Sequence, residues 1–217
     1  MPSATIELEA GRGTGVLDSE AIVGVLMAGG GSRRMGSDKA AVALGGRPLA
    51  HWAAATVAAT SPHRVQSGGP PIGGLGWKIL SDLRPGGGPA AGIETALACF
   101  PGAAIAVCAV DSPFVPPALL RAALTLLGPG VEAAVPWFEG RWHPLIAAYS
   151  PAILPALTEW LDSERYSLRK LLDTRRVAKI ERTEIEQLGE PATLLTNINT
   201  PEDLTRAEAF VSGAELL

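Results

Sequence analysis

Two runs of consecutive apolar residues stand out along the chain, and each ends abruptly. The run 22–27 (IVGVLM) ends at a series of glycines, and the run 103–110 (AAIAVCAV) ends at Asp111. Uninterrupted apolar runs with β-branched members are typical of strands buried on both faces, as in the middle of a parallel sheet. The pattern therefore predicts two central strands of such a sheet.

Helical and shorter strand patterns alternate with these runs. Apolar residues at helical spacing predict helices over 48–60, 93–100, 116–127, 152–161, 167–174 and 201–210. Further strands are predicted at 77–81, 132–136 and 177–181, and a hairpin with Glu139-Gly140 at its tip leads into 143–149. This alternation predicts the α/β class, with a mostly parallel sheet to which the hairpin adds antiparallel strands.

The composition fits a folded chain of modest size. Of its 217 residues, 47% are apolar and 18% charged, which excludes a disordered chain. Residues 1–20 show no clear period and are expected to form a loose N-terminal extension. Residues 21–217 are expected to form a single domain, because they contain no repeat and no dividing linker.

Charge and cysteine usage narrow the partners and the compartment. The net charge of −4 provides no overall positive field for DNA or RNA, so an anionic ligand would need a local basic patch. Cys99 and Cys108 lie in apolar runs without metal-binding spacing, which favours reduced core residues. The N-terminus has no apolar signal segment, and the uncharged stretch 95–110 is too short to span a bilayer. A cytoplasmic protein without a membrane partner is therefore expected.

The unusual chemistry follows the predicted strands. Ligands of parallel α/β sheets bind beyond the carboxyl ends of the strands, so 28–39, 82–92 and 111–116 are expected to share one rim.

The first of these segments, AGGGSRRMGSDK, combines glycines with three cations. Glycines let successive backbone N–H groups turn toward an anion, and Arg33, Arg34 and Lys39 can neutralise phosphate oxygens. The loop therefore fits a triphosphate, and the alternative is a tight turn whose cations face water. A Walker loop is excluded because Ser37, not lysine, follows Gly36. NAD binding is disfavoured because a GxGxxG pattern would need its third glycine at Arg34 and an acidic residue further downstream.

The same loop, extended to 28–40, resembles the AGGxSxRMGxDK signature of the MobA family, the molybdenum cofactor guanylyltransferases. The similarity covers 22–210 and includes 82–92 (DLRPGGGPAAG), 111–114 (DSPF), 143–145 (HPL) and 197–204 (NINTPEDL). Ala90 stands where the family usually has Leu, and Ser112 where it has Met. Both are interpreted as packing variants that lie near the predicted site and could alter its shape.

The resemblance implies a Rossmann-like, three-layer α/β/α nucleotidyltransferase fold and a Mg²⁺-dependent reaction. GMP would pass from GTP to the phosphate of Mo-molybdopterin, giving molybdopterin guanine dinucleotide and pyrophosphate. The implied partners are GTP, Mo-molybdopterin and proteins of molybdenum cofactor biosynthesis or acceptor enzymes. Such a transfer needs alignment and charge neutralisation but no protein nucleophile, and the sequence shows no persuasive nucleophile motif.

The family motifs also imply roles for individual residues. The expected catalytic residues are Lys39 on the α-phosphate, Arg33 or Arg34 on the outer phosphates, and Asp111 as the Mg²⁺ ligand. The expected nucleotide-binding residues are Leu26, Ala28, Gly29, Gly30, Gly31, Lys39, Asp82 and Asp111. The expected molybdopterin-binding residues are Asn197, Asn199 and His143.

Structural roles are open for several of these side chains. Asp111 could cap the helix after Pro113, Asp82 could cap a turn, and the asparagines could cap the helix at 201–210. His143 could be a satisfied structural residue. Four basic residues could form a second pocket for an anion or a solvated face: Arg141, Arg165, Arg169 and Lys170. Trp137 and Trp142 are interpreted as packing residues.

Two other functions remain open. One is a sister nucleotidyltransferase with another base or acceptor, such as a molybdopterin cytidylyltransferase, and the other is a noncatalytic nucleotide-binding protein. The second would not need Asp111 together with Lys39.

Overall fold

Strands and helices alternate along the chain as the apolar pattern predicts. In this computed structural model, which describes residues 22–29 and 39–213, the strands are β1 (Ile22–Met27), β2 (Ala43–Leu44), β3 (Arg47–Pro48), β4 (His63–Ser67), β5 (Lys78–Leu80), β6 (Ala104–Ala109), β7 (Ala133–Phe138), β8 (Arg141–Trp142), β9 (Ile146–Tyr149) and β10 (Val177–Ile180). The α-helices are α1 (Leu49–Thr60), α2 (Gly88–Cys99), α3 (Pro117–Thr125), α4 (Leu154–Asp162), α5 (Leu168–Leu172), α6 (Arg182–Glu186), α7 (Pro191–Leu194) and α8 (Pro201–Val211).

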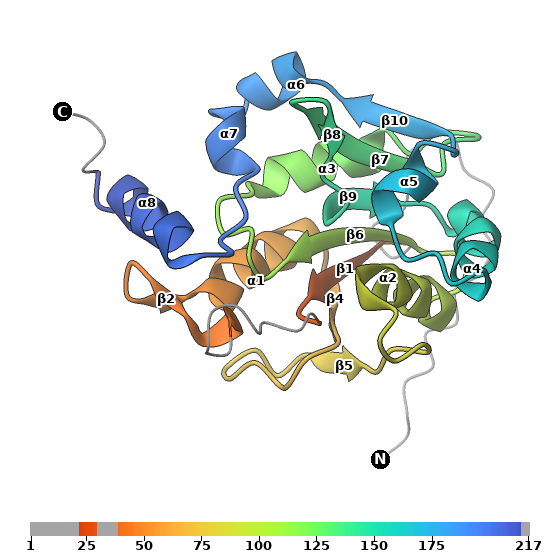
Figure 1. The fold of residues 1–217 in the computed structure, drawn as a ribbon, viewed down its shortest axis with the longest axis horizontal. Coiled ribbons are helices and arrows are strands. Elements are labelled where there is room, and N and C mark those ends of the chain that lie inside the picture. The colour runs from red at the N-terminus through yellow and green to blue at the C-terminus, as the bar shows by residue number, and fades with distance from the viewer. Residues whose placement is uncertain (1–21, 30–38, 214–217) are drawn as a thin grey trace.

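One mixed sheet organises the fold, in the order β10-β7-β9-β6-β1-β4-β5 with β8 paired to β7 (Figure 1). The central strand β1 pairs in parallel with β6 and β4, and β4 pairs in parallel with β5. Antiparallel β9 lies between β6 and β7, and the β7–β8 hairpin extends that side of the sheet. The predicted α/β class, with a mostly parallel sheet and some antiparallel strands, is confirmed.

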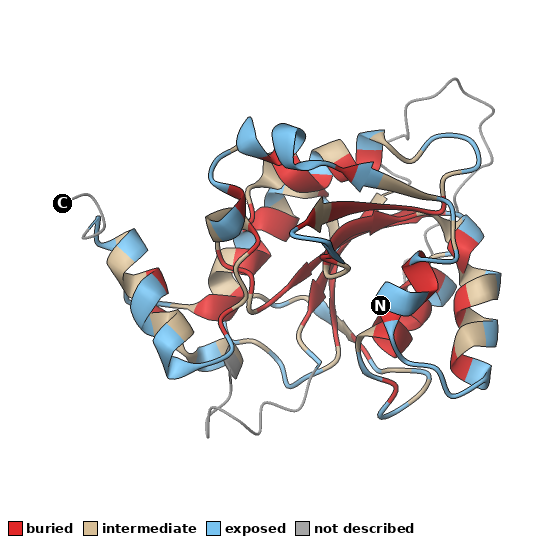
Figure 2. Ribbon diagram, turned by 45° about the horizontal axis from the view of Figure 1, so that its top comes forward, coloured by how far each residue is buried: buried red, intermediate tan, exposed pale blue. Residues whose placement is uncertain are grey.

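Helices cover both faces of the sheet, because alternate residues of the buried strands point to opposite sides (Figure 2). On one face Val25 and Ile105 pack with residues of α2, α4 and α5. On the other face Leu26 and Cys108 pack with α1 and α3. At Gly24 a Cβ atom would lie 2.7 Å from Cγ1 of Val57, so glycine is what lets α1 approach β1 this closely.

The elements missed from the sequence are short or polar. Strand β4 reads HRVQS and carries no apolar run, and α6 and α7 span only 5 and 4 residues. Helix α8 packs beside the small β2–β3 hairpin through a separate cluster that includes Leu44, Leu49 and Ala207.

Two expectations about single features have different outcomes. Cys108 is a buried free thiol as predicted, but Cys99 at the end of α2 is exposed, so its assignment to the core is wrong. Trp137 and Trp142 pack edge to face with ring centroids 4.6 Å apart, and the Trp142 indole donates to Asp173 at 2.7 Å, as expected of packing residues. Within the described ranges, none of the helices is long and apolar enough to cross a membrane.

A buried ion pair ties β10 to the start of β7. Glu132, with a side chain 4% exposed, accepts from Arg175 at 2.5 Å and from the backbone N–H of Arg176 at 3.0 Å. Burial alone would raise the pKa of Glu132, but these hydrogen bonds and the charges of Arg175 and Arg176 outweigh it and hold the pKa below its ordinary value.

We expect Glu132→Gln to lower the free energy of unfolding by about 2 to 3 kcal/mol near pH 7, measured by urea denaturation. Because the folded-state pKa lies below the unfolded one, this stabilisation is present above pH 4.5 and is lost as the pH falls through the folded-state pKa. The difference between wild type and variant should therefore shrink in acid. Glu186→Gln, which breaks only an exposed pair with Arg182, is the control and should cost less than about 0.5 kcal/mol. An equal cost at pH 7 for both variants would contradict the prediction.

Candidate active site

The sheet topology gathers the predicted site residues on one rim. Strands β1, β4, β5 and β6 run parallel, so the segments that follow them leave the sheet at the same edge. Antiparallel β9 begins at this edge, which brings His143 beside the end of β6, and the Ala109 amide donates to the Leu145 carbonyl at 3.1 Å. The expectation of a shared rim is therefore confirmed for its described part.

Backbone hydrogen bonds join the loops that follow β1 and β4 at one end of this rim. The amides of Ala28 and Gly29 donate to the Ser67 carbonyl at 2.9 and 3.1 Å. At Gly69, whose φ is +70°, a Cβ atom would lie 2.7 Å from the Ala28 carbonyl oxygen, so glycine is required where the two loops meet. The buried Gln66 side chain holds the second loop by donating to the carbonyls of Gly68 and Pro70 at 2.8 and 2.7 Å. The loop after β4, held by Gln66, therefore supports the start of the turn after β1.

Asp82 lies at the same end, two residues beyond β5. Its Oδ1 atom is buried and has no hydrogen-bond partner among the described residues, and burial raises the pKa of the carboxyl group. The residue does not cap α2, whose N-cap is Gly87. Because buried polar atoms are normally paired, an orphaned carboxylate oxygen at a rim is typical of a ligand contact.

Asp111 and Asn197 meet at the middle of the rim although they lie 86 positions apart in the sequence. The Asn197 Nδ2 atom donates to Oδ1 of Asp111 at 2.9 Å and to Oγ of Ser112 at 2.8 Å. The Ile198 amide also donates to the Asp111 carbonyl at 2.9 Å. Asp111 does not cap α3, which begins after Pro116, so the capping alternative is wrong. Ser112 is fully buried, and its hydroxyl belongs to this cluster, so the residue takes part in the site beyond its packing.

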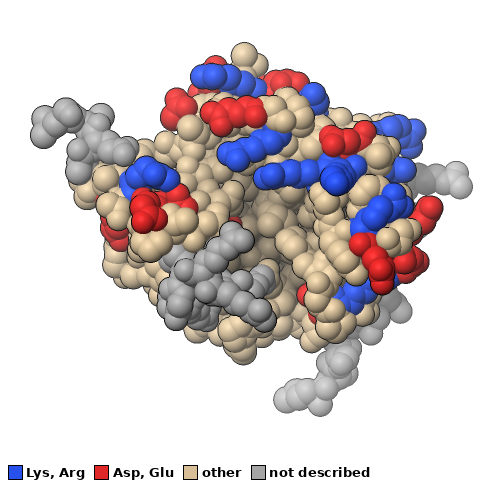
Figure 3. Space-filling model, viewed as in Figure 1, with Lys and Arg blue, Asp and Glu red and all other residues tan. Residues whose placement is uncertain are grey.

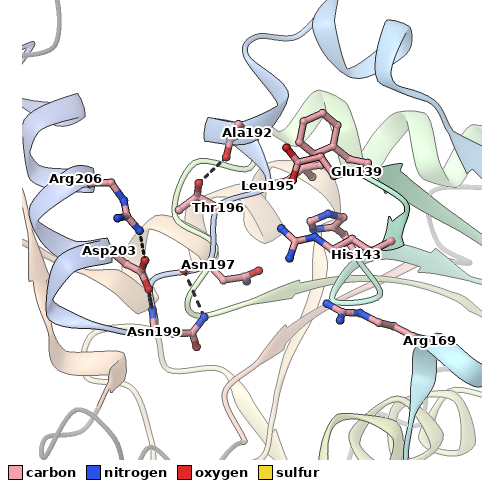
Figure 4. A pocket seen from close by; sticks show the side chains of 12 residues that line it. Glu139, His143, Arg169, Ala192, Leu195, Thr196, Asn197, Asn199, Asp203 and Arg206 are labelled. Atoms are coloured by element: carbon pink, nitrogen blue, oxygen red, sulfur yellow. Dashed lines mark hydrogen bonds and ion pairs between the residues drawn. The ribbon is translucent and has the colours of Figure 1, made fainter.

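A cavity of about 430 Å³ opens beside Asn197, between α7, α8, the β7–β8 hairpin and α5 (Figure 4). It is lined by Phe138, Glu139, Arg141, His143, Arg169, Ala192, Leu195, Thr196, Asn197, Asn199, Asp203 and Arg206. All three residues predicted to bind the second substrate are present in this set. The alternative that the asparagines cap α8 is wrong, because its N-cap is Thr200, whose side chain accepts from the Asp203 N–H. The backbone N–H of Asn199 donates to the Asp203 carboxylate at 2.9 Å.

His143 is the most buried polar residue of the cavity wall, with an exposed fraction of 5%. Its Nε2 atom is buried and has no partner among the described residues. Burial, together with the charges of Arg141 and Arg169, lowers the pKa of His143 to about 4. The imidazole is therefore neutral at pH 7, and its Nε2 atom can either donate or accept a hydrogen bond, depending on the tautomer.

The basic side chains of the cavity come from separate elements. Arg141 projects from the hairpin and Arg169 from α5, where its Nε donates to the Trp142 carbonyl at 3.2 Å. Figure 3 shows the face hollowed at its centre, with Lys and Arg side chains along the edge of the hollow. Arg206, which pairs with Asp203, was missed, since no signal in the local sequence places α8 at the wall of the cavity. Arg165 lies over the Trp160 ring at 3.8 Å instead of in the cavity.

Part of the predicted phosphate loop falls outside the described part of the chain. Gly30, Gly31, Arg33 and Arg34 lie outside the described residues. Lys39 begins a short 3₁₀ helix, Lys39–Ala41, but its side chain also lies outside what is described. Leu26 is fully buried in the core beneath α1, so only its backbone could reach a nucleotide.

The described rim fits a Mg²⁺ ion whose ligands come partly from the protein and partly from the substrate. No group of three or more His, Cys, Asp or Glu side chains that could hold a metal occurs in residues 22–29 and 39–213. Mg²⁺ needs no such group, because it typically takes one or two carboxylates and completes its shell with water and phosphate oxygens. Asp111 provides a carboxylate at the rim, and Asn197 provides an amide beside it.

Comparisons with known proteins agree with this geometry. A family profile described as "MobA-like NTP transferase domain" matches residues 24–180. A probable molybdenum cofactor guanylyltransferase of Pelotomaculum thermopropionicum is 33% identical over 196 residues, covering 88% of this chain and 94% of that protein. The crystal structure of molybdopterin-guanine dinucleotide biosynthesis protein A from Archaeoglobus fulgidus has a TM-score of 0.75 and 27% identity, covering 88% of this chain and 99% of that one. The 2-C-methyl-D-erythritol 4-phosphate cytidylyltransferase of Thermus thermophilus, at 24% identity and a TM-score of 0.63 over 87% of this chain and 98% of that one, shares the fold.

Proposed function

The chain belongs to the family of MobA-like NTP transferases and is a nucleotidyltransferase, and from that premise we propose that it makes molybdopterin guanine dinucleotide. GMP would pass from GTP to the terminal phosphate of Mo-molybdopterin. The observation that carries the proposal is that the rim has two different ends. At one end a buried carboxylate oxygen has no partner among the described residues, and at the other lies a basic cavity. Asp111 and Asn197 lie between these two ends.

Asp82 is the proposed contact for the base. A carboxylate offers two acceptor oxygens, and the Watson–Crick edge of guanine offers two adjacent donors, N1–H and the N2 amino group. Cytosine and adenine pair one amino donor with a ring acceptor, which a carboxylate would repel. The buried Oδ1 atom would gain the partner that it lacks among the described residues. Guanine is therefore the base that fits this end of the rim.

The turn after β1 is the proposed phosphate cradle. The backbone amides beyond Gly29 would donate hydrogen bonds to the triphosphate, and Arg33 and Arg34 would neutralise its charge. Lys39 would stabilise charge on the α-phosphate. Asp111 would hold a Mg²⁺ ion, which supplies further positive charge at the phosphates when it is bound. These roles rest on the family motif for the residues outside the described ranges.

The cavity is the proposed acceptor site. Arg141 and Arg169 would hold the acceptor phosphate, while His143 and Asn197 offer hydrogen bonds to it or to the pterin. Asn199 would line the same wall. A phosphate oxygen of the acceptor would then attack the α-phosphorus of GTP, the bond between that phosphorus and the α–β bridging oxygen would break, and pyrophosphate would leave. Because both reactants are anions, alignment and charge neutralisation are the protein's contribution.

We expect GTP with Mg²⁺ to raise the melting temperature more than CTP, ATP or UTP does, because a ligand that binds only the native state stabilises it. Asp82→Asn should reduce the GTP effect, since an amide replaces one acceptor with a donor that faces the guanine donors. We expect about 10-fold weaker GTP binding and a smaller change for CTP, measured by calorimetry. A stronger effect of CTP on the wild type would favour the sister cytidylyltransferase instead.

A further inference from the structure

Ser112 lies behind Asp111 and Asn197 and is not among the residues that line the cavity. The residue is fully buried, and its hydroxyl oxygen accepts from Asn197 Nδ2 at 2.8 Å. Its own hydroxyl points to Oδ1 of Asp111 at 3.4 Å, a long contact. Asn197 also donates to that carboxylate oxygen, at 2.9 Å.

These bonds define the orientation of the Asn197 amide. A carboxylate accepts hydrogen bonds and cannot donate them, so the amide nitrogen, not the oxygen, must face Asp111. The nitrogen has two hydrogens, and Asp111 and Ser112 take one each. The polar side-chain atom that Asn197 has left for a ligand is therefore its amide oxygen, Oδ1. Asn197 lines the cavity, and Figure 4 shows its side chain pointing toward the side of the cavity that holds His143.

We propose that Ser112 is a positioning residue that acts through Asn197, fixing the Asp111 carboxylate and directing the Asn197 amide oxygen toward the acceptor cavity. The proposal rests on the proposed function, because it assigns Asp111 and Asn197 to the substrates. Without the serine hydroxyl, the amide keeps its hydrogen bond to Asp111 but loses the second of the two acceptors that fix its plane. The hydrogen bond from that amide to Asp111 Oδ1 is then held less firmly, which changes how the carboxylate is presented to a metal ion.

Hydrogen-bond partners of a metal-binding carboxylate typically change metal affinity without touching the ion. Ser112 lies in that position relative to Asp111. The main chain contributes as well, since the Ile198 amide holds the Asp111 carbonyl at 2.9 Å and keeps the two segments together when the side-chain bonds are changed. Removing the hydroxyl should therefore affect metal binding more than folding.

The test is the Mg²⁺ concentration at which GTP raises the melting temperature half-maximally. We expect Ser112→Ala to raise this concentration about 10-fold. The matched control is Ser61→Ala, which removes another buried hydroxyl, bonded to the carbonyls of Ile22 and His63 at 2.8 and 2.9 Å at the opposite end of β1. The control should lower the melting temperature but leave the Mg²⁺ midpoint unchanged. A Ser112→Ala midpoint equal to that of the wild type would overturn the proposal.

A double-mutant cycle separates action through Asn197 from a general loosening of the rim. If Ser112 acts through that amide, Ser112→Ala should add little in an Asn197→Ala background, because the group that it positions is already absent. Ser112→Thr keeps a hydroxyl and should restore the midpoint where it folds. Independent, additive effects of the two alanine substitutions would refute the mechanism. A wild type with no Mg²⁺-dependent GTP stabilisation would refute the proposed function itself, which keeps the two failures distinguishable.

Discussion

Asp111→Asn is expected to lower the rate of pyrophosphate release from GTP and Mo-molybdopterin by about 100- to 1,000-fold, with little change in melting temperature. Asparagine keeps the size of the side chain and an acceptor oxygen for the Asn197 amide, which donates at 2.9 Å in the wild type. It loses the negative charge that would hold Mg²⁺ at the phosphates in the proposed mechanism. The effect should therefore fall on the chemical step and not on the fold.

Asp173→Asn is a matched control for this substitution. Asp173 also accepts a side-chain N–H on Oδ1, from Trp142 at 2.7 Å, but it does not line the cavity. Its rate should stay within a factor of about 2 of the wild type, as is usual for substitutions away from a site. Near-normal turnover by Asp111→Asn would remove the proposed mechanism. GTP binding without turnover in the wild type would instead favour a noncatalytic nucleotide-binding protein.

The sequence predicted the central strands best, because burial on both faces leaves a purely local signal. The first apolar run matches β1, and the second exceeds β6 by one residue at each end. Strand β4 was missed because two of its inward residues are Gln66 and Ser67, which are buried and polar. Gln66 is polar because its side chain holds the adjoining loop by hydrogen bonds. This role interrupts the apolar pattern by which the strand could have been recognised in the sequence.

The rim was predictable because parallel topology places strand ends together, whatever the side chains are. The pairing of Ser112 with Asn197, across 85 positions, was not, since no spacing rule links two loops that meet only in the folded chain. Ala90, the other departure from the family motif, is fully buried in the core as expected of a packing variant. The two substitutions look alike in sequence, and their surroundings alone distinguish them.

Replacing both Arg141 and Arg169 with alanine is expected to raise the KM for Mo-molybdopterin about 100-fold, roughly 10-fold for each lost charge-assisted hydrogen bond. The affinity for GTP should change little, because the cavity lies beyond Asn197 from the proposed base contact at Asp82. Arg165→Ala, which removes an arginine that lies over Trp160, is the control and should leave both parameters unchanged. An unchanged acceptor KM in the double variant would exclude the cavity as the acceptor site.

The same double variant should change the titration of His143. Burial is the main cause of its pKa of about 4, and the charges of Arg141 and Arg169 lower it further, so their removal should raise the pKa toward its ordinary value of 6.5. Because the folded-state pKa is depressed, the wild type loses stability as the pH falls from 6.5 toward 4, where only the unfolded chain binds the proton. In the double variant this loss should be smaller. NMR titration of the imidazole and urea denaturation across that range measure the two effects, and a His143 pKa unchanged by the substitutions would show that the arginine charges do not reach the imidazole.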